Sequence, residues 1–238
     1  MPGFDNQEVN EHLCLSAARN LGLRAAKTEV RTFGSERAIV VTRFDRHRDP
    51  RTGKWQRLHQ EDMCQALGVH PTSKYQFEGG PAAASVVALL RRVLPAPVAV
   101  AEVWRFVDAL IFNWLIGGTD AHAKNYGLVH SRDQTRLAPL YDIASILPYD
   151  YSKGHKPKLA MKIGGEYELK GVGPKQWVKF AEDIDLDPDD VLQRTISLAE
   201  RIAPAFVDAA ASTEHAAEFA THLAALVAER ANAVLAAM

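Results

Sequence analysis

The sequence has little cysteine, almost no surplus charge and no long uncharged hydrophobic run. Its 238 residues include 28 Lys and Arg against 29 Asp and Glu, which gives a formal net charge of −1. This balance excludes a free-standing nucleic-acid binder that works through bulk positive charge, because neutralising phosphates needs a cationic surplus. Hydrophobic residues make up 47% and charged residues 24%, as in ordinary folded domains, so disordered and fibrous classes are excluded.

The two cysteines and the longest apolar segment bear on the cellular compartment. Neither Cys14 nor Cys64 has a CxxC partner or a metal-ligand spacing, which favours two buried, reduced thiols. Charged residues interrupt the apolar segment 96–118, whereas a membrane span needs roughly 20 apolar residues. The first residues are polar and acidic, unlike a signal peptide. We therefore expect a cytoplasmic protein without a membrane partner.

Hydrophobic periodicity predicts a small α+β piece followed by a mostly helical remainder. Residues 6–21 have the spacing of a helix, and residues 28–33 and 37–44 have the composition of two strands joined by a short turn. The charged segment 45–57 is expected to be a solvated connection at a lobe boundary. The remaining predicted elements are helices over 59–67, 81–93 and 97–116, a hairpin over 126–141, and C-terminal helices from Asp187 and over 212–238. The predicted lobes are residues 1–46 and 47–238.

The densest cluster of polar residues follows the most apolar predicted helix. Two glycines end that helix and lead into a loop that carries four polar residues, Asp120, His122, Lys124 and Asn125. A rigid scaffold that holds such a loop is a favoured place for catalysis. Directly after the predicted hairpin, Asp142 is a single carboxylate among apolar neighbours.

The spacing of these residues matches the requirements of phosphoryl transfer. In protein kinases a catalytic Asp precedes a metal-binding Asn by five positions, and a second metal-binding Asp follows a short hairpin. Here Asp120 precedes Asn125 by five positions and Asp142 follows the hairpin. The pattern predicts that Asp120 orients or deprotonates the attacking hydroxyl and that Asn125 and Asp142 hold Mg²⁺. Lys124 is close enough in sequence to contact the transferred phosphate.

Each of these residues taken alone has a structural explanation that is at least as common. Asp120 could follow a glycine stop as a loop residue, His122 could be a hydrogen-bonded structural histidine, and Asn125 could hold a turn. Asp142 could cap a helix that starts at the next residue. A metal-dependent hydrolase is less favoured, because Asp120 and His122 are two positions apart and the chain has no HExxH motif. The three kinase positions in order favour a functional site.

Several motifs together identify a family resemblance. The chain resembles the kinase domain of HipA-type toxins, the serine/threonine kinases of type II toxin–antitoxin modules. The matching segments occur in family order along nearly the whole chain: VTRFDR (41–46), LHQEDMCQ (58–65), KY (74–75), GGP (79–81), FNWLIGGTDAHAKN (112–125), PLYDI (139–143) and KLAM (158–161).

The resemblance implies a protein-kinase-like α+β fold with ATP and Mg²⁺ between two lobes. Asp120 matches the catalytic aspartate, with Lys124 beside it, and Asn125 and Asp142 match the magnesium ligands. The expected cofactor-binding residues are those of the hinge that lines the adenine and one from the loop: Thr42, Arg43, Phe44, Asp45 and His122. Expected partners are a protein substrate, such as an aminoacyl-tRNA synthetase, and a HipB-like antitoxin. DNA is expected only indirectly, through the antitoxin.

Two parts of a complete kinase are missing from the sequence. The Gly-rich phosphate loop and the strand lysine precede, in the family, the helix that begins here near residue 6. Glu11 could match the helix glutamate that pairs with such a lysine. The resemblance thus implies an incomplete small lobe of one helix and two strands. The chain is then a truncated or a split catalytic portion, and in the split case a separate chain supplies the missing strands, as in relatives that divide the kinase. The alternative is a non-catalytic remnant that binds an antitoxin or another partner.

Overall fold

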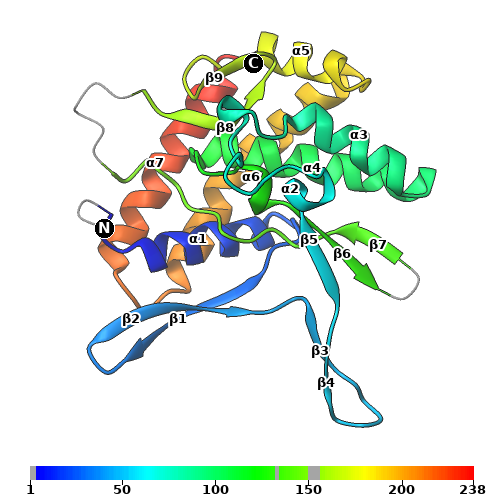
Figure 1. Cartoon of the computed structure of the whole chain (residues 1–238). Helices are drawn as coiled ribbons and strands as arrows, with labels where there is room; N and C mark the ends of the chain where they lie inside the picture. The colour runs from blue at the N-terminus through cyan, green and yellow to red at the C-terminus, as the bar shows by residue number, and fades with distance from the viewer. Residues whose placement is uncertain (1–3, 132–133, 150–155) are drawn as a thin grey trace.

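The computed structural model describes residues 4–131, 134–149 and 156–238, and its elements succeed one another in a helix–hairpin–helices order (Figure 1). The elements before the long central helix are α1 (Gln7–Asn20), β1 (Lys27–Phe33), β2 (Glu36–Thr42), β3 (Arg46–Arg48), β4 (Trp55–Arg57), β5 (His59–Asp62), α2 (Met63–Ala66), the 3₁₀ turn η1 (Gln76–Glu78) and α3 (Ala83–Val93). The central helix and the later elements are α4 (Ala96–Ile116), the 3₁₀ turn η2 (Ala123–Asn125), β6 (Gly127–Ser131), β7 (Gln134–Leu137), β8 (Lys158–Ile163), β9 (Glu166–Glu168), α5 (Pro174–Asp183), α6 (Pro188–Ala211) and α7 (Ala217–Leu235).

Helix α1 and the β1–β2 ribbon form the small N-terminal part that the sequence predicts. The two strands pair antiparallel from Lys27 opposite Thr42 to Phe33 opposite Glu36. Thr28 is buried against α1, where its hydroxyl lies 2.9 Å from Nδ1 of His12. In the described residues this sheet has two strands only, so each has an outer edge without a strand partner.

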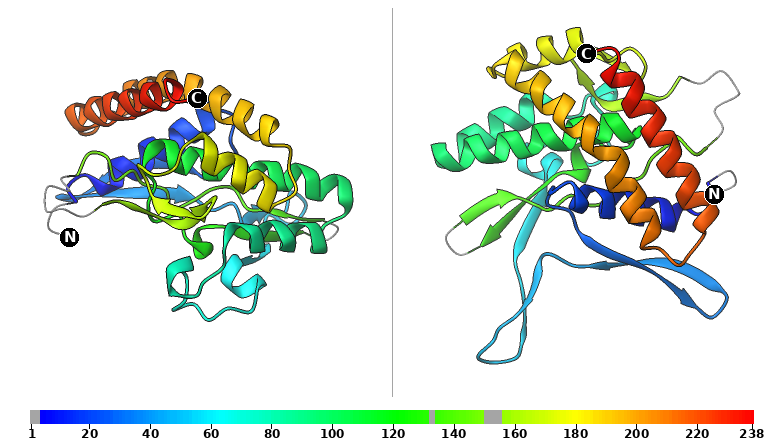
Figure 2. Two further views of the ribbon diagram at one scale, coloured as in Figure 1. Left: turned by 90° about the horizontal axis from the view of Figure 1, so that it is seen from above. Right: turned by 180° about the vertical axis from the view of Figure 1, so that it is seen from behind.

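Helix α4 is the centre of the large lobe. It is apolar on nearly all sides, and its buried residues include Phe106, Ile111 and Phe112, as expected for a helix enclosed by other elements. Helices α6 and α7 lie side by side and, with α1, cover one side of the core (Figure 2). The amide of Asn20 at the end of α1 donates to the carbonyl of Ala205 in α6 at 3.1 Å, 185 residues away in sequence.

Two sequence predictions about the region after β2 are wrong. The segment 45–57 is not a simple connection, because β3 and β4 pair antiparallel and form a ribbon that projects from the body (Figure 1). Residues 59–62 form strand β5 rather than the start of a helix, since β5 pairs with β6 over its whole length. Helix α2 begins only at Met63, where the Asp62 carboxylate accepts the backbone N–H of Gln65 in a capping box.

The other predicted elements are present, and the structure adds helix α5 and a short hairpin that are not predicted from the sequence. Strands β6 and β7 form the predicted hairpin, and Asp187 caps α6 by accepting the N–H of Asp189. Cys14 and Cys64 are buried free thiols. The sequence does not predict pairing around the glycines after residue 163, but β8 and β9 do pair there. None of the helices in the described part of the chain has the length and hydropathy that a bilayer crossing demands. The predicted lobe boundary after residue 46 stays a prediction.

Candidate active site

The loop that carries Asp120 is shaped by the two glycines at the end of α4. Gly117 has φ +67°, a left-handed conformation that ends the helix and favours glycine. Gly118 lies so close to α4 that a Cβ there would be 2.4 Å from Oδ1 of Asn113. Asn113 is itself fixed, because its amide donates to the Ala109 carbonyl at 2.9 Å. The loop therefore leaves the helix in one direction and places Asp120 at an exposed position.

Asn125 connects the two carboxylate-bearing segments. Its side-chain amide donates to the backbone carbonyl of Asp120 at 2.9 Å and to the backbone carbonyl of Asp142 at 3.2 Å. Asn125 is buried, and the turn η2 that carries it is anchored by the Asn125 N–H bond to the His122 carbonyl at 2.9 Å. Because the amide nitrogen makes both contacts, the amide oxygen faces away from them and is available to a ligand.

Asp142 is held in place by long-range backbone contacts on both sides. Before it, Leu140 donates to the Arg24 carbonyl at 2.7 Å; after it, the Ser145 N–H donates to Oδ1 of Asn10 at 2.9 Å. Asp142 has φ +55°, which is uncommon for a residue with a side chain. The residues directly after it, 143–149, are not helical, so Asp142 does not cap a helix. Desolvation by the surrounding chain and the neighbouring Asp120 raise the pKa of Asp142.

Tyr75, which sequence reasoning did not select as a site residue, contacts the predicted catalytic carboxylate. Its hydroxyl donates to Oδ1 of Asp120, and desolvation together with this contact raises the pKa of Tyr75. Lys74 also lies at the site: its backbone carbonyl accepts the Ala123 N–H at 3.2 Å, and its charge partly opposes the rise in the pKa of Asp142. The KY pair at 74–75 was the available signal, since it was among the segments of the family resemblance.

His122 lies beneath Asp120 and is buried. Its Nε2 is 3.9 Å from Oδ1 of Asp120, and its ring packs edge-on against Tyr75 with the centroids 5.0 Å apart. Burial lowers the pKa of His122, so the ring is neutral near pH 7. Its Nδ1 has no hydrogen-bond partner among the described residues. His122 therefore lies next to Asp120 without a hydrogen bond to it, and its predicted role in cofactor binding stays a prediction.

Lys124 points to a different part of the surface. Its Nζ lies 3.6 Å from Oδ2 of Asp62, the cap of α2. Successive side chains of a 3₁₀ turn diverge by about 120°, so Lys124 and Asn125 cannot face the same way. The predicted contact of Lys124 with a phosphate would require this ion pair to open.

The predicted hinge residues lie between β2 and β3. Phe44 stacks on Tyr141 with ring centroids 5.8 Å apart, which connects the hinge to the segment that carries Asp142. Thr42 ends β2 and is exposed. Asp45 is buried, and Arg43 donates to both of its carboxylate oxygens at 2.8 Å each, while Arg46 also donates to Oδ2. The Asp45 carboxylate thus pairs with arginines of the hinge itself.

Replacing Asp45 by Asn should destabilise the protein in a pH-dependent way. Hydrogen bonds from Arg43 lower the pKa of Asp45 from 3.8 to about 2, a contribution of about 2 kcal/mol at neutral pH. Because the folded-state pKa is depressed, this stability is present above about pH 4 and is lost as the pH falls through about 2. Urea unfolding of wild type and Asp45→Asn at pH 7 and at pH 2.5 measures it. Equal unfolding midpoints of wild type and Asp45→Asn at pH 7 would contradict the stabilising role of the Asp45 carboxylate. Asp183→Asn, at an exposed site, is the matched control and should change the midpoint little.

Glu11 adds a third carboxylate to the site. It lies on α1, close enough to Asp142 for the Asp142 charge to act on its pKa. Burial and the Asp142 charge raise the pKa of Glu11 from 4.5 to about 7. A nearby cation would stabilise the ionised form of Glu11. The negative charge of the site therefore favours the binding of a cation.

The residues present fit a magnesium ion. Among the described residues, no three His, Cys, Asp or Glu side chains are arranged to hold a metal by themselves. Mg²⁺ takes few protein ligands and completes its shell with water and substrate phosphates. The Asn125 amide oxygen and the Asp142 carboxylate, whose pKa is raised by burial and by the Asp120 charge, are oxygen donors of the kind that such an ion takes.

The arrangement of lobes, hairpin and loop defines a protein-kinase-like α+β fold. HipA from Shewanella oneidensis, solved in complex with HipB and operator DNA, superposes with a TM-score of 0.86 at 25% identity, over 98% of this chain and 57% of that chain. The proinflammatory kinase CtkA of Helicobacter pylori shares the fold, with a TM-score of 0.61 at 14% identity over 98% of this chain and 85% of that chain.

Sequence comparisons then give the family. The model of the HipA-like C-terminal domain matches residues 2–223, and the chain belongs to this family. A Sinorhizobium fredii protein named "Putative kinase Y4mE" is 38% identical over 203 residues, 85% of this chain and 47% of that protein. The "Serine/threonine-protein kinase toxin HipA" of Shewanella oneidensis is 27% identical over 208 residues, 84% of this chain and 47% of that protein. The chain thus spans about half the length of these relatives.

Proposed function

We propose that this chain is the catalytic portion of a HipA-like serine/threonine protein kinase that transfers the γ-phosphate of ATP to a protein hydroxyl. The observation that carries the proposal is the double hydrogen bond of Asn125. It fixes the backbones of Asp120 and Asp142 relative to each other, and so brings a carboxylate for the acceptor and two oxygen donors for a metal into one site.

In this proposal each residue has a distinct chemical task. Asp120, held by Tyr75 at one oxygen, has the other oxygen free to accept the proton of the attacking hydroxyl. Neutral His122 beneath it adds no positive charge that would lower the basicity of Asp120. Asn125 and Asp142 would hold Mg²⁺, which neutralises charge on the ATP phosphates when bound. Thr42, Arg43 and Phe44 would line the adenine.

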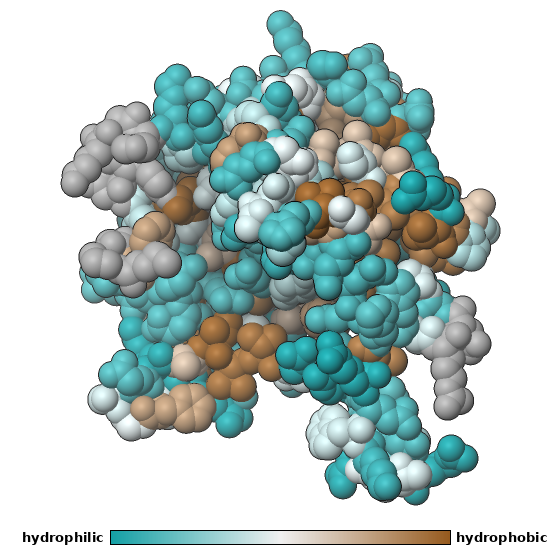
Figure 3. Space-filling view, viewed as in Figure 1, coloured by the Kyte–Doolittle hydropathy of each residue, from teal (hydrophilic) through white to brown (hydrophobic). Residues whose placement is uncertain are grey.

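The β1–β2 ribbon supports the proposal that further strands complete the small lobe. An isolated two-stranded hairpin is at most marginally stable and needs further strands or a helix to pack on; α1 contacts this ribbon, but its two outer edges have no strand partner among the described residues. Phe33 and Val41 on this ribbon are 58% and 40% exposed, and Figure 3 shows apolar atoms over the ribbon. We propose that strands carrying a Gly-rich loop and a lysine pair here, with the lysine reaching Glu11. They would come from a separate chain or from further sequence of the same polypeptide.

The proposed partners are inferred from the family. A HipB-like antitoxin is the proposed protein partner, because the structurally similar HipA was solved with HipB and operator DNA. DNA would then be reached through the antitoxin, which agrees with the net charge of −1. The phosphorylated protein is proposed, on the family resemblance alone, to be a component of translation such as an aminoacyl-tRNA synthetase.

MgATP binding by calorimetry tests the proposal. The chain alone should bind ATP weakly, and more tightly with Mg²⁺ than in EDTA. Adding the product of a neighbouring reading frame that encodes a Gly-rich loop and a strand lysine should raise the affinity at least about tenfold, because phosphate contacts are added. Absence of binding in both experiments would overturn the kinase proposal and leave a partner-binding remnant.

A further inference from the structure

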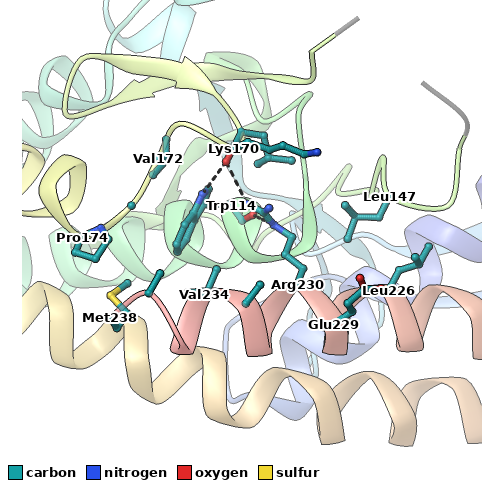
Figure 4. Close-up of a pocket in the computed structure, with 14 residues that line it drawn as sticks. Trp114, Leu147, Lys170, Val172, Pro174, Leu226, Glu229, Arg230, Val234 and Met238 are labelled. Carbon is teal, nitrogen blue, oxygen red and sulfur yellow. Dashed lines mark hydrogen bonds between the residues drawn. The ribbon is translucent and has the colours of Figure 1, made fainter. Parts of the chain in front are cut away.

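An apolar cavity in the large lobe lies apart from the Asp120 site. Its volume is about 480 Å³, within the range of small-molecule sites, and none of Asp120, Asn125 and Asp142 lines it. Figure 4 shows side chains from α4, α7 and the segment before α5 converging on it. Trp114, Val172 and Val234, which line it, are each less than a tenth exposed, so its apolar wall is fixed by the core.

Arg230 is the polar group set into this apolar wall. Its Nε donates to the Trp114 carbonyl at 3.1 Å and its Nη2 to the Leu169 carbonyl at 3.3 Å, and its guanidinium lies over the Trp114 ring at 5.5 Å (Figure 4). No carboxylate forms an ion pair with it within the ranges that the structure describes. Two carbonyls use only two of its five N–H donors, and burial lowers the pKa of Arg230 to about 10.

The other charged side chains that line the cavity are at its rim. Lys170 and Glu229 line the opening, and both are exposed to solvent. Their opposite charges offset each other, and water screens them more than it screens Arg230. Arg230 is therefore the charged side chain of the interior, and the apolar residues Leu147, Leu226 and Val234 line the cavity with it.

We propose that this cavity binds a single-tailed carboxylate, with the carboxylate on Arg230 and the aliphatic tail against the apolar wall. A guanidinium fork matches the two oxygens of one carboxylate, and an apolar surrounding strengthens the pair. A partly buried cation without a carboxylate partner is costly, and a bound anion relieves this cost. The tail covers apolar surface that otherwise faces water.

Octanoate and 1-octanol are matched probes, because they share a tail and differ in charge. Calorimetry and tryptophan fluorescence on the 238-residue chain should show saturable octanoate binding at one site, at least about tenfold tighter than 1-octanol. Arg230→Met should remove this preference. Ala233→Phe, at an exposed position on the cavity lining, should block both probes without disturbing the core, whereas Ala225→Phe on the same helix, outside the lining, should leave binding unchanged.

If Arg230→Met does not fold, Ala233→Phe still tests the proposal. Ala233→Phe leaves Arg230 and the two carbonyls bonded to it unchanged. Equal affinities of wild type for octanoate and 1-octanol would overturn the proposal. Octanoate binding that survives Ala233→Phe would overturn it too, since the ligand would then lie elsewhere.

Discussion

Replacing Asp120 by Asn should lower phosphoryl transfer at least about 100-fold and leave ATP affinity within about twofold. The change removes the proton acceptor, and general-base catalysis contributes a factor of about 100 to 10,000. The Asn Oδ1 can still accept the Tyr75 hydroxyl, so the loop geometry is kept. The measurement is labelled γ-phosphate incorporation into a whole-cell protein extract, beside calorimetric ATP binding.

The matched control is Asp185→Asn. Asp185 is also a loop aspartate, its side chain is 95% exposed, and its φ of +52° suits asparagine. It should change neither transfer nor binding. Weakened ATP binding with transfer preserved in Asp120→Asn would assign Asp120 to the nucleotide and contradict its role as base.

Asp142→Asn should abolish the magnesium dependence of ATP binding, with a loss of at least about tenfold in MgATP affinity. It removes the charge that holds the metal, while asparagine tolerates the left-handed backbone at this position. Asp142→Ala should give the same loss and in addition incur a backbone penalty of about 1 kcal/mol. Calorimetry with Mg²⁺ and with EDTA measures the effect; in EDTA, wild type and both variants should bind alike.

Thermal unfolding of the same variants separates the functional from the structural role of Asp142. Without metal, Asp142→Asn should melt no lower than wild type, because it relieves repulsion with Asp120 and Glu11. A variant that unfolds instead would show that Asp142 serves the fold and would remove it from the proposed metal site.

Much of the fold could be predicted because its signals are local. The long, mostly apolar run over 96–116 predicts α4, Gly117 predicts its end, and Asp187 with the following proline predicts the start of α6. The strand identity of β5 could not be found in this way. Its four residues are polar or charged and short, and only pairing with β6, over 60 residues later in the chain, makes them a strand.

The candidate site shows the same division between local and distant information. The order Asp120, Asn125, Asp142 is visible in the sequence because kinase chemistry fixes the residue types and spacing. The contact from Tyr75 depends on a loop 45 residues earlier, and the carboxylate of Asp45 faces arginines rather than the site. No periodicity encodes either fact, since both arise from how segments meet in three dimensions.

The bond from Asn20 to Ala205 has a consequence for synthesis on the ribosome. Helix α1 is made first, but its partner in α6 is 185 residues later. At 5–20 residues per second the ribosome needs roughly 10–40 s to supply it. During that time the apolar face of α1, including Val9 and Leu13, has no native cover from α6. The apolar face of α1 therefore stays without its native cover until α6 has been made.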